Sequence, residues 1–143
     1  MSRIIYTKSD GTVSIITPAG DVNDAIKDVP SGLSYEIVED SVIPTDRSFR
    51  NAWKQNSKTI ETDMTKAKEI HKTNIRKARI PKLAELDIEY QRATETSANT
   101  SDIVAKKQAL RDAPAASGIS TAANTTELKA QWDTNILGTS PYS

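Results

Sequence analysis

The chain has 143 residues, of which 36% are hydrophobic, 27% are charged and only 5% are aromatic, and its 19 Lys and Arg residues are balanced by 19 Asp and Glu residues. This neutral balance gives no overall attraction to nucleic acid or to an anionic membrane. The absence of cysteine excludes disulfides, thiolate metal sites and cysteine nucleophiles, and the scarcity of aromatic residues indicates a small core.

The first 45 residues have the pattern of a small antiparallel β unit. Residues 3–8 are rich in β-forming residues, an Asp-Gly turn follows, and residues 12–17 provide the returning strand. Asp21 is well placed to cap a short helix, and residues 34–39 alternate as a third strand. The sequence therefore predicts a hairpin plus a third strand, covered by one short helix.

A helical region is expected next. Asp46 is a good N-cap for a short helix over residues 47–54, and the polar stretch at residues 55–62 indicates a loop. This short helix would connect the β unit to the longest predicted element of the chain.

That longest element is a charged helix from Asp63 to Glu95. At 1.5 Å per residue it would be about 45–50 Å long, yet its apolar stripe is thin. Pro81 removes a backbone donor from its interior, which predicts either a kink near residues 76–80 or two helices that meet there. A helix so long with so narrow an apolar face requires a second helix, or another chain, to complete its core.

The remainder of the chain is expected to supply that second helix and then a linker. Ser101 is placed to cap a helix to about residue 113, which folds back antiparallel on residues 83–93 if the loop between them is tight. Residues 114–143 have the composition of an Ala/Ser/Thr-rich linker with one short helix at about 126–133. The expected fold class is α+β, with an N-terminal β unit followed by a helical hairpin, in three parts: residues 1–45, 46–113 and 114–143.

The sequence shows no catalytic apparatus. His71 is the only histidine, and neither cysteine nor a second histidine is present to complete a zinc site, so we expect a half-exposed helix residue there. The glycines are scattered singly, which excludes a phosphate-binding loop, and Asp87 and Glu89 lie on different helix faces. The sequence therefore predicts a protein that is not an enzyme and holds neither a metal nor a cofactor.

Basic residues crowd the first half of the long helix, and acidic residues crowd the second half. Helical spacing places four of the basic residues on nearly one face, an arrangement suited to phosphate contacts: Lys68, Lys72, Arg76 and Arg79. However, no stacking aromatic residues are interleaved with them, and no nucleic-acid-reading motif frames them. The charge pattern therefore favours a helix that pairs with a partner or has a solvated face. The alternative hypothesis is a small nucleic-acid-binding protein that uses this basic half-helix.

Aromatic residues provide the strongest candidates for partner contacts. Phe49 and Trp53 form an i,i+4 pair that either anchors a local core or forms an interface hot spot, and Trp132 leaves the same two interpretations open. The thin apolar stripe of the long helix supplies the other candidates. The predicted partner-binding residues are Phe49, Trp53, Ile75, Leu83, Leu86, Tyr90 and Trp132.

Four segments of the chain are distinctive as strings: PTDRSFRNAW at 44–53, DMTKAKEIH at 63–71, PKLAELD at 81–87 and KKQALRD at 106–112. Together they resemble a group of small tailed-bacteriophage proteins related to tail and tail-fibre assembly chaperones. The resemblance covers most of residues 1–113 and implies a β-rich N-terminal part and a helical C-terminal part. It also implies a non-enzymatic protein that binds the tail fibre or a neighbouring tail part, in the host cytoplasm during assembly or in the virion tail.

These observations lead to one main hypothesis, a structural or chaperone-like assembly protein that binds a phage tail-fibre or other tail protein. Self-association into a homo-oligomer is a further interpretation of the thin apolar stripe. No segment is apolar enough for a secretory signal or a membrane span, so we expect no membrane insertion.

Overall fold

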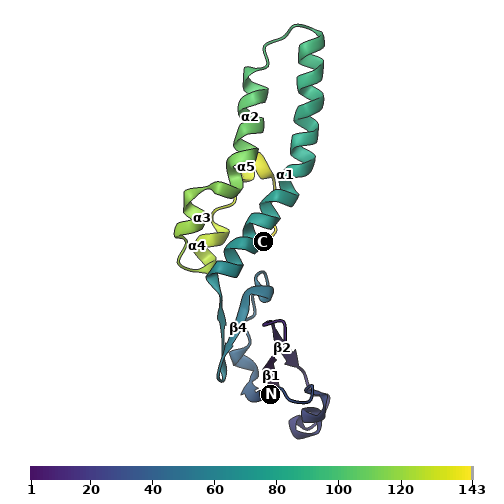
Figure 1. Cartoon of the computed structure of the whole chain (residues 1–143), viewed down its shortest axis with the longest axis vertical. Coiled ribbons are helices and arrows are strands. Elements are labelled where there is room, and N and C mark those ends of the chain that lie inside the picture. Colours follow the sequence, from purple (N-terminus) through teal and green to yellow (C-terminus); the bar gives the residue numbers. More distant parts are fainter. Residues whose placement is uncertain (143) are drawn as a thin grey trace. The chain divides into compact units, whose positions relative to one another are not determined.

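The computed structural model of the chain describes residues 1–142. The chain forms two compact units, a β unit of residues 1–67 and a helical unit from residue 68 onward. All five strands belong to the β unit, while most of the helices belong to the helical unit (Figure 1). This division differs from the expected three parts, because residues 46–67 belong with the β unit and residues 114–142 belong with the helical unit.

The predicted three-stranded antiparallel sheet is confirmed. The strands β1 (Ser2–Thr7), β2 (Val13–Ile16) and β3 (Tyr35–Glu39) are arranged in the order β2-β1-β3. Ile4 of the central strand pairs with Ile16 on one side and Ile37 on the other, and it is fully buried. The covering helix is the 3₁₀ segment η1 (Val22–Asp28), which Asp21 caps by accepting a hydrogen bond from the backbone N–H of Asn23.

A second hairpin follows where the sequence predicted a short helix and a loop. After the 3₁₀ turns η2 (Asp40–Val42) and η3 (Arg50–Ala52), strands β4 (Trp53–Asn56) and β5 (Thr59–Thr62) pair antiparallel. The helix expected over residues 47–54 and the loop expected over 55–62 are therefore wrong.

The polar composition of this hairpin explains the error. Every second side chain of the two strands is exposed, so there is no apolar run to mark them. The turn contains Ser57 at φ 52°, in place of the glycine that would have signalled it. Asp46 does not start a helix of the expected length, and its carboxylate instead accepts a hydrogen bond from the backbone N–H of Ser48.

The long helix is confirmed as α1 (Met64–Glu95), a single helix of 32 residues. Asp63 caps it, since its carboxylate accepts hydrogen bonds from the backbone N–H groups of Thr65 and Lys66. Pro81 lies inside the helix, and Figure 1 shows the helix axis changing direction part-way along α1. Of the two alternatives, the structure has a bent helix and not two separate ones.

Helix α2 (Ser101–Asp112) folds back antiparallel beside the C-terminal half of α1, as predicted (Figure 1). The turn between them uses Ser97 at φ 57°, followed by a hydrogen bond from the backbone N–H of Ala98 to the carbonyl of Ala93. Ser101 is the first helical residue and not the cap. Its backbone N–H donates a hydrogen bond to the side-chain oxygen of Asn99.

Residues 114–142 are not a linker. They contain four short helical segments: η4 (Ala113–Ala115), α3 (Ser117–Thr121), α4 (Thr125–Lys129) and α5 (Thr134–Leu137). Ile119 and Leu128, which are 1% and 0% exposed, give these segments a core. The short helix expected over residues 126–133 ends at Lys129, which leaves Trp132 in the connection to α5.

Candidate partner-binding surface

His71 on α1 is fully buried, so the half-exposed position expected from the sequence is wrong. Its Nε2 atom lies 2.9 Å from the carbonyl oxygen of Gln131, and its Nδ1 atom lies 2.6 Å from the hydroxyl of Tyr142. Because a carbonyl oxygen only accepts, Nε2 carries the proton and the Tyr142 hydroxyl donates to Nδ1. Asn74 in turn donates to the Tyr142 oxygen at 3.1 Å.

This network fixes the C-terminal segment on α1. The His71 and Tyr142 rings stack with centroids 5.6 Å apart, and the Trp132 ring approaches His71 edge-on at 6.1 Å. Burial lowers the pKa of His71 below its ordinary value. The hydrogen bond to the Gln131 carbonyl raises this pKa, but by less. Burial also raises the pKa of Tyr142, so both rings are neutral at pH 7. The arrangement supports the fold and leaves the imidazole inaccessible.

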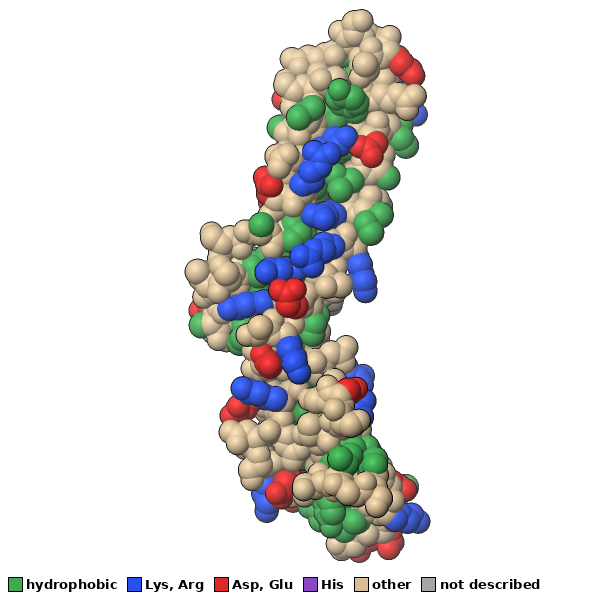
Figure 2. Space-filling model, viewed as in Figure 1, with side chains coloured by type: hydrophobic (Ala, Val, Ile, Leu, Met, Phe, Trp, Pro, Cys, Tyr) green, Lys and Arg blue, Asp and Glu red, His purple; other side chains and the backbone are tan. Residues whose placement is uncertain are grey.

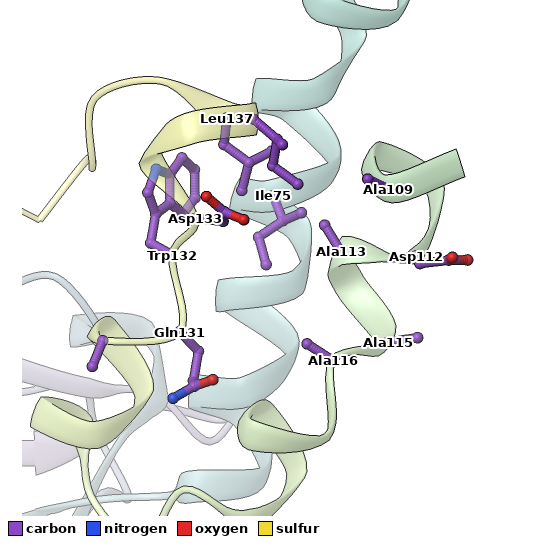
Figure 3. Close-up of a pocket in the computed structure, with 12 residues that line it drawn as sticks. Ile75, Ala109, Asp112, Ala113, Ala115, Ala116, Gln131, Trp132, Asp133 and Leu137 are labelled. Atoms are coloured by element: carbon purple, nitrogen blue, oxygen red, sulfur yellow. The ribbon is translucent and has the colours of Figure 1, made fainter. Parts of the chain in front are cut away.

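The segment held by His71 forms one wall of an apolar groove of about 640 Å³ (Figure 3). Ile75 of α1 contributes to its lining, and Trp132 and Leu137 line it from the C-terminal segment. The other wall, from the end of α2 through η4, carries mostly alanine side chains: Ala109, Ala113, Ala115 and Ala116. Because alanine extends little beyond the backbone, this wall leaves space that the chain itself does not fill.

Two carboxylates line the groove, and they are not equivalent. Figure 3 shows the Asp133 side chain between those of Trp132 and Ile75, whereas the Asp112 side chain points away from them. Asp133 also caps α5, because it accepts a hydrogen bond from the backbone N–H of Asn135 at 3.0 Å. An apolar groove with one inward carboxylate suits an apolar stem that ends in a cation, as in lysine or arginine.

A smaller pocket of about 210 Å³ adjoins this groove, since Ile136 lines both. It lies between α1, α2 and α5, with Leu86 and Leu110 at its apolar part. Its charged lining residues are of both signs: Lys82, Glu85, Glu89 and Lys106. The two pockets together extend the candidate surface along the helical unit.

The seven residues predicted to bind a partner do not form one surface. Five of them are in the interior of the two units: Phe49, Trp53, Ile75, Leu86 and Trp132. The burial of Phe49 and Trp53 supports the local-core interpretation of that pair. Leu83 is half-buried, and Tyr90 is 40% exposed beneath the ammonium of Lys107, which lies 5.3 Å from the ring centroid. Ile75 and Trp132 nevertheless line the groove.

The basic face predicted on α1 is partly used by the chain itself. Lys68 donates to the carbonyl of Ser120, and Lys72 pairs with Glu69. Arg79 donates to the carbonyls of Leu110 and Arg111 at the end of α2, where a cation offsets the helix dipole. Figure 2 shows Lys and Arg side chains gathered along one face of the helical unit, with hydrophobic side chains among them.

The alanine wall and three exposed apolar residues on the helical hairpin are not among the residues that the sequence predicts to bind a partner. Ile80, Ile88 and Val104 are 66%, 52% and 48% exposed. The predicted helix ended at about residue 113, so only Ala115 and Ala116 of this wall were assigned to a linker. The signal that marks the wall is the run of small residues at 113–118, which begins three residues after the buried Leu110. Helical projection of α1 identifies Ile80 and Ile88, because both lie away from the face that contains Ile75 and Leu86.

Comparison with known proteins identifies no relative: no family model, curated protein or solved structure matches the chain. Within residues 1–142, no group of His, Cys, Asp and Glu side chains is placed to bind a metal ion. Of the helices in this described part, none is both long and apolar enough to cross a lipid bilayer.

Proposed function

We propose that the chain is a non-enzymatic bacteriophage protein that binds a tail-fibre or other tail protein, as an assembly chaperone or a structural component. The resemblance of residues 44–53, 63–71, 81–87 and 106–112 to small tail-associated phage proteins supports this assignment. The observation that carries it is the open apolar groove beside α1, which the chain forms but does not fill. The protein would act in the host cytoplasm during assembly, and mass spectrometry of purified particles would show whether it stays in the virion.

The chemistry of the groove describes the segment that it would bind. Its apolar lining favours an aliphatic or aromatic side chain, and full burial of one such side chain contributes about 1.5–3 kcal/mol. The carboxylate of Asp133 favours a neighbouring Lys or Arg. A single pocket of this kind gives weak binding, which fits a partner that is held and later released.

Co-expression with the fibre and neighbouring tail proteins of the same phage tests this proposal. Ala116 is exposed and lines the groove, so Ala116→Phe fills the groove without disturbing the core. Asp133→Asn removes the charge but keeps a good helix cap. We expect both variants to lose copurification with the partner, while Ala105→Phe, at an exposed α2 position outside both pockets, retains it. Undiminished copurification of both groove variants would reject the groove as the binding site.

The nucleic-acid hypothesis predicts a different result for the same purified protein. Three of its four basic side chains, Lys68, Lys72 and Arg79, already contact other groups of the chain, which weakens this alternative. Phosphate contacts are strongest at low salt, so a mobility shift of DNA or RNA at about 50 mM salt would favour it. We expect no shift.

A further inference from the structure

A second candidate surface is an exposed face of α1, which borders the C-terminal segment at Lys77, since Lys77 lines a pocket with Thr139 and Pro141. Six exposed residues recur there at spacings of four and three, which places them along one face of the helix: Lys77, Pro81, Ala84, Ile88, Gln91 and Glu95. We call these six residues the outer stripe. Helical projection places the stripe opposite Leu86, which is buried in the hairpin.

The outer stripe is complementary to itself when it is reversed. Lys77 and Glu95 each lie nine residues from position 86, and Ala84 and Ile88 each lie two residues from it. A second α1 running antiparallel would therefore place Lys77 opposite Glu95 twice and Ile88 opposite the small Ala84 twice. A two-fold symmetric interface requires this property, because each residue must match its counterpart in the reversed copy.

We propose that two copies of this chain associate through an antiparallel pair of α1 helices centred near position 86. The charges of the stripe favour this orientation, because a parallel pair in register would place Lys77 against Lys77 and Glu95 against Glu95. Neither residue has an ion-pair partner within residues 1–142, although the Glu95 carboxylate accepts a hydrogen bond from Gln91 at 3.3 Å. A heterologous partner would not require the stripe to match its own reverse.

The contact area is small, so the dimer is observed only at high protein concentration. Ile88 is the only large apolar residue of the stripe, and with its smaller and polar neighbours it buries much less than the roughly 1,200–2,000 Å² of a stable interface. The dimer is therefore weak, and its population rises with protein concentration. The inference does not depend on the proposed tail partner, because it is tested on the purified chain alone.

Sedimentation velocity over a dilution series measures the association. We expect a concentration-dependent shift from monomer to dimer, and Ile88→Glu should raise the dissociation constant at least about tenfold because it buries two carboxylates at the centre. Val104→Glu is the matched control, since Val104 is similarly exposed but lies on α2. Circular dichroism confirms that both variants fold. A wild-type chain that stays monomeric at every concentration would overturn the proposal.

Two further experiments, charge reversal and disulfide cross-linking, determine the orientation. Lys77→Glu or Glu95→Lys alone should weaken the dimer about threefold to tenfold, and the double variant should restore it. The chain contains no cysteine, so introduced cysteines report proximity without interference. A mixture of Ala84→Cys and Ile88→Cys chains should oxidise mainly to the mixed disulfide dimer. Preferential linkage of Ala84→Cys to itself, or a double charge variant weaker than either single one, contradicts the antiparallel pair.

Discussion

The hydroxyl of Tyr142 lies 2.6 Å from Nδ1 of His71, although 71 residues separate the two in the sequence. The contact joins the last described residue to the second turn of α1 and lies beside Trp132, which lines the candidate groove. The groove thus depends on a hydrogen bond that holds its C-terminal wall in place.

Tyr142→Phe should destabilise the helical unit by about 1–2 kcal/mol. The substitution keeps the stacked ring but removes the hydroxyl, which leaves the buried Nδ1 of His71 without its donor. Urea unfolding in a Trp53→Phe background measures the effect, because the remaining tryptophan, Trp132, then reports on the helical unit alone.

Tyr35→Phe is the control for this measurement, since Tyr35 is 39% exposed and lies in the β unit. It should leave the Trp132 transition unchanged. If Tyr142→Phe also leaves the Trp132 transition unchanged, the hydroxyl does not hold the C-terminal segment.

The stability of the helical unit should fall as the pH falls below the ordinary His pKa of 6.5. Burial lowers the pKa of His71 in the folded chain, so the unfolded chain binds the proton first. The stabilisation is therefore complete above 6.5 and is lost as the pH decreases towards the lowered folded value.

Because His71 is the only histidine, its imidazole gives a single set of ring signals in an NMR titration. We expect a midpoint below 6.5 in the folded chain. A midpoint at or above that value would contradict the buried, neutral tautomer with its proton on Nε2.

The sequence predicted the elements whose signals are local. The strands beside an Asp-Gly turn, the helix cap at Asp21 and the antiparallel return of α2 follow from turn chemistry, capping and apolar spacing. The hairpin β4–β5 was missed because its exposed side chains alternate with buried or half-buried ones, which leaves no apolar run. In addition, Ser57 takes a turn conformation that is usually occupied by glycine.

The groove was missed for a different reason. Its C-terminal wall depends on His71, Gln131 and Tyr142, which are remote in sequence and carry no shared motif. Two residues of its alanine wall, Ala115 and Ala116, lie where composition predicted a linker, and the packing of Ile119 and Leu128 shows that this segment is folded. Sequence spacing does not encode such long-range contacts.

The folded state of residues 114–142 gives a third prediction. Leu128→Ala should cost about 2–5 kcal/mol, because it removes a fully buried side chain and leaves a cavity in the helical unit. The Trp132 transition in urea measures this loss, with Val104→Ala as an exposed control. A cost below about 0.5 kcal/mol is typical of surface positions and would indicate that the segment is the linker that composition suggests.

Ser57→Gly should stabilise the β unit by about 0.5–1 kcal/mol. Ser57 has φ 52°, in the left-handed region, where a side chain is strained and glycine is not. The gain is smaller than the relieved strain, because glycine also increases the entropy of the unfolded chain. Trp53 fluorescence in a Trp132→Phe background follows this unit, and Ser9→Gly, where φ is not positive, should destabilise it slightly or leave it unchanged. Destabilisation by Ser57→Gly would mean that the turn of the second hairpin does not have the conformation described. It would also contradict the strand register that places Trp53 opposite Thr62.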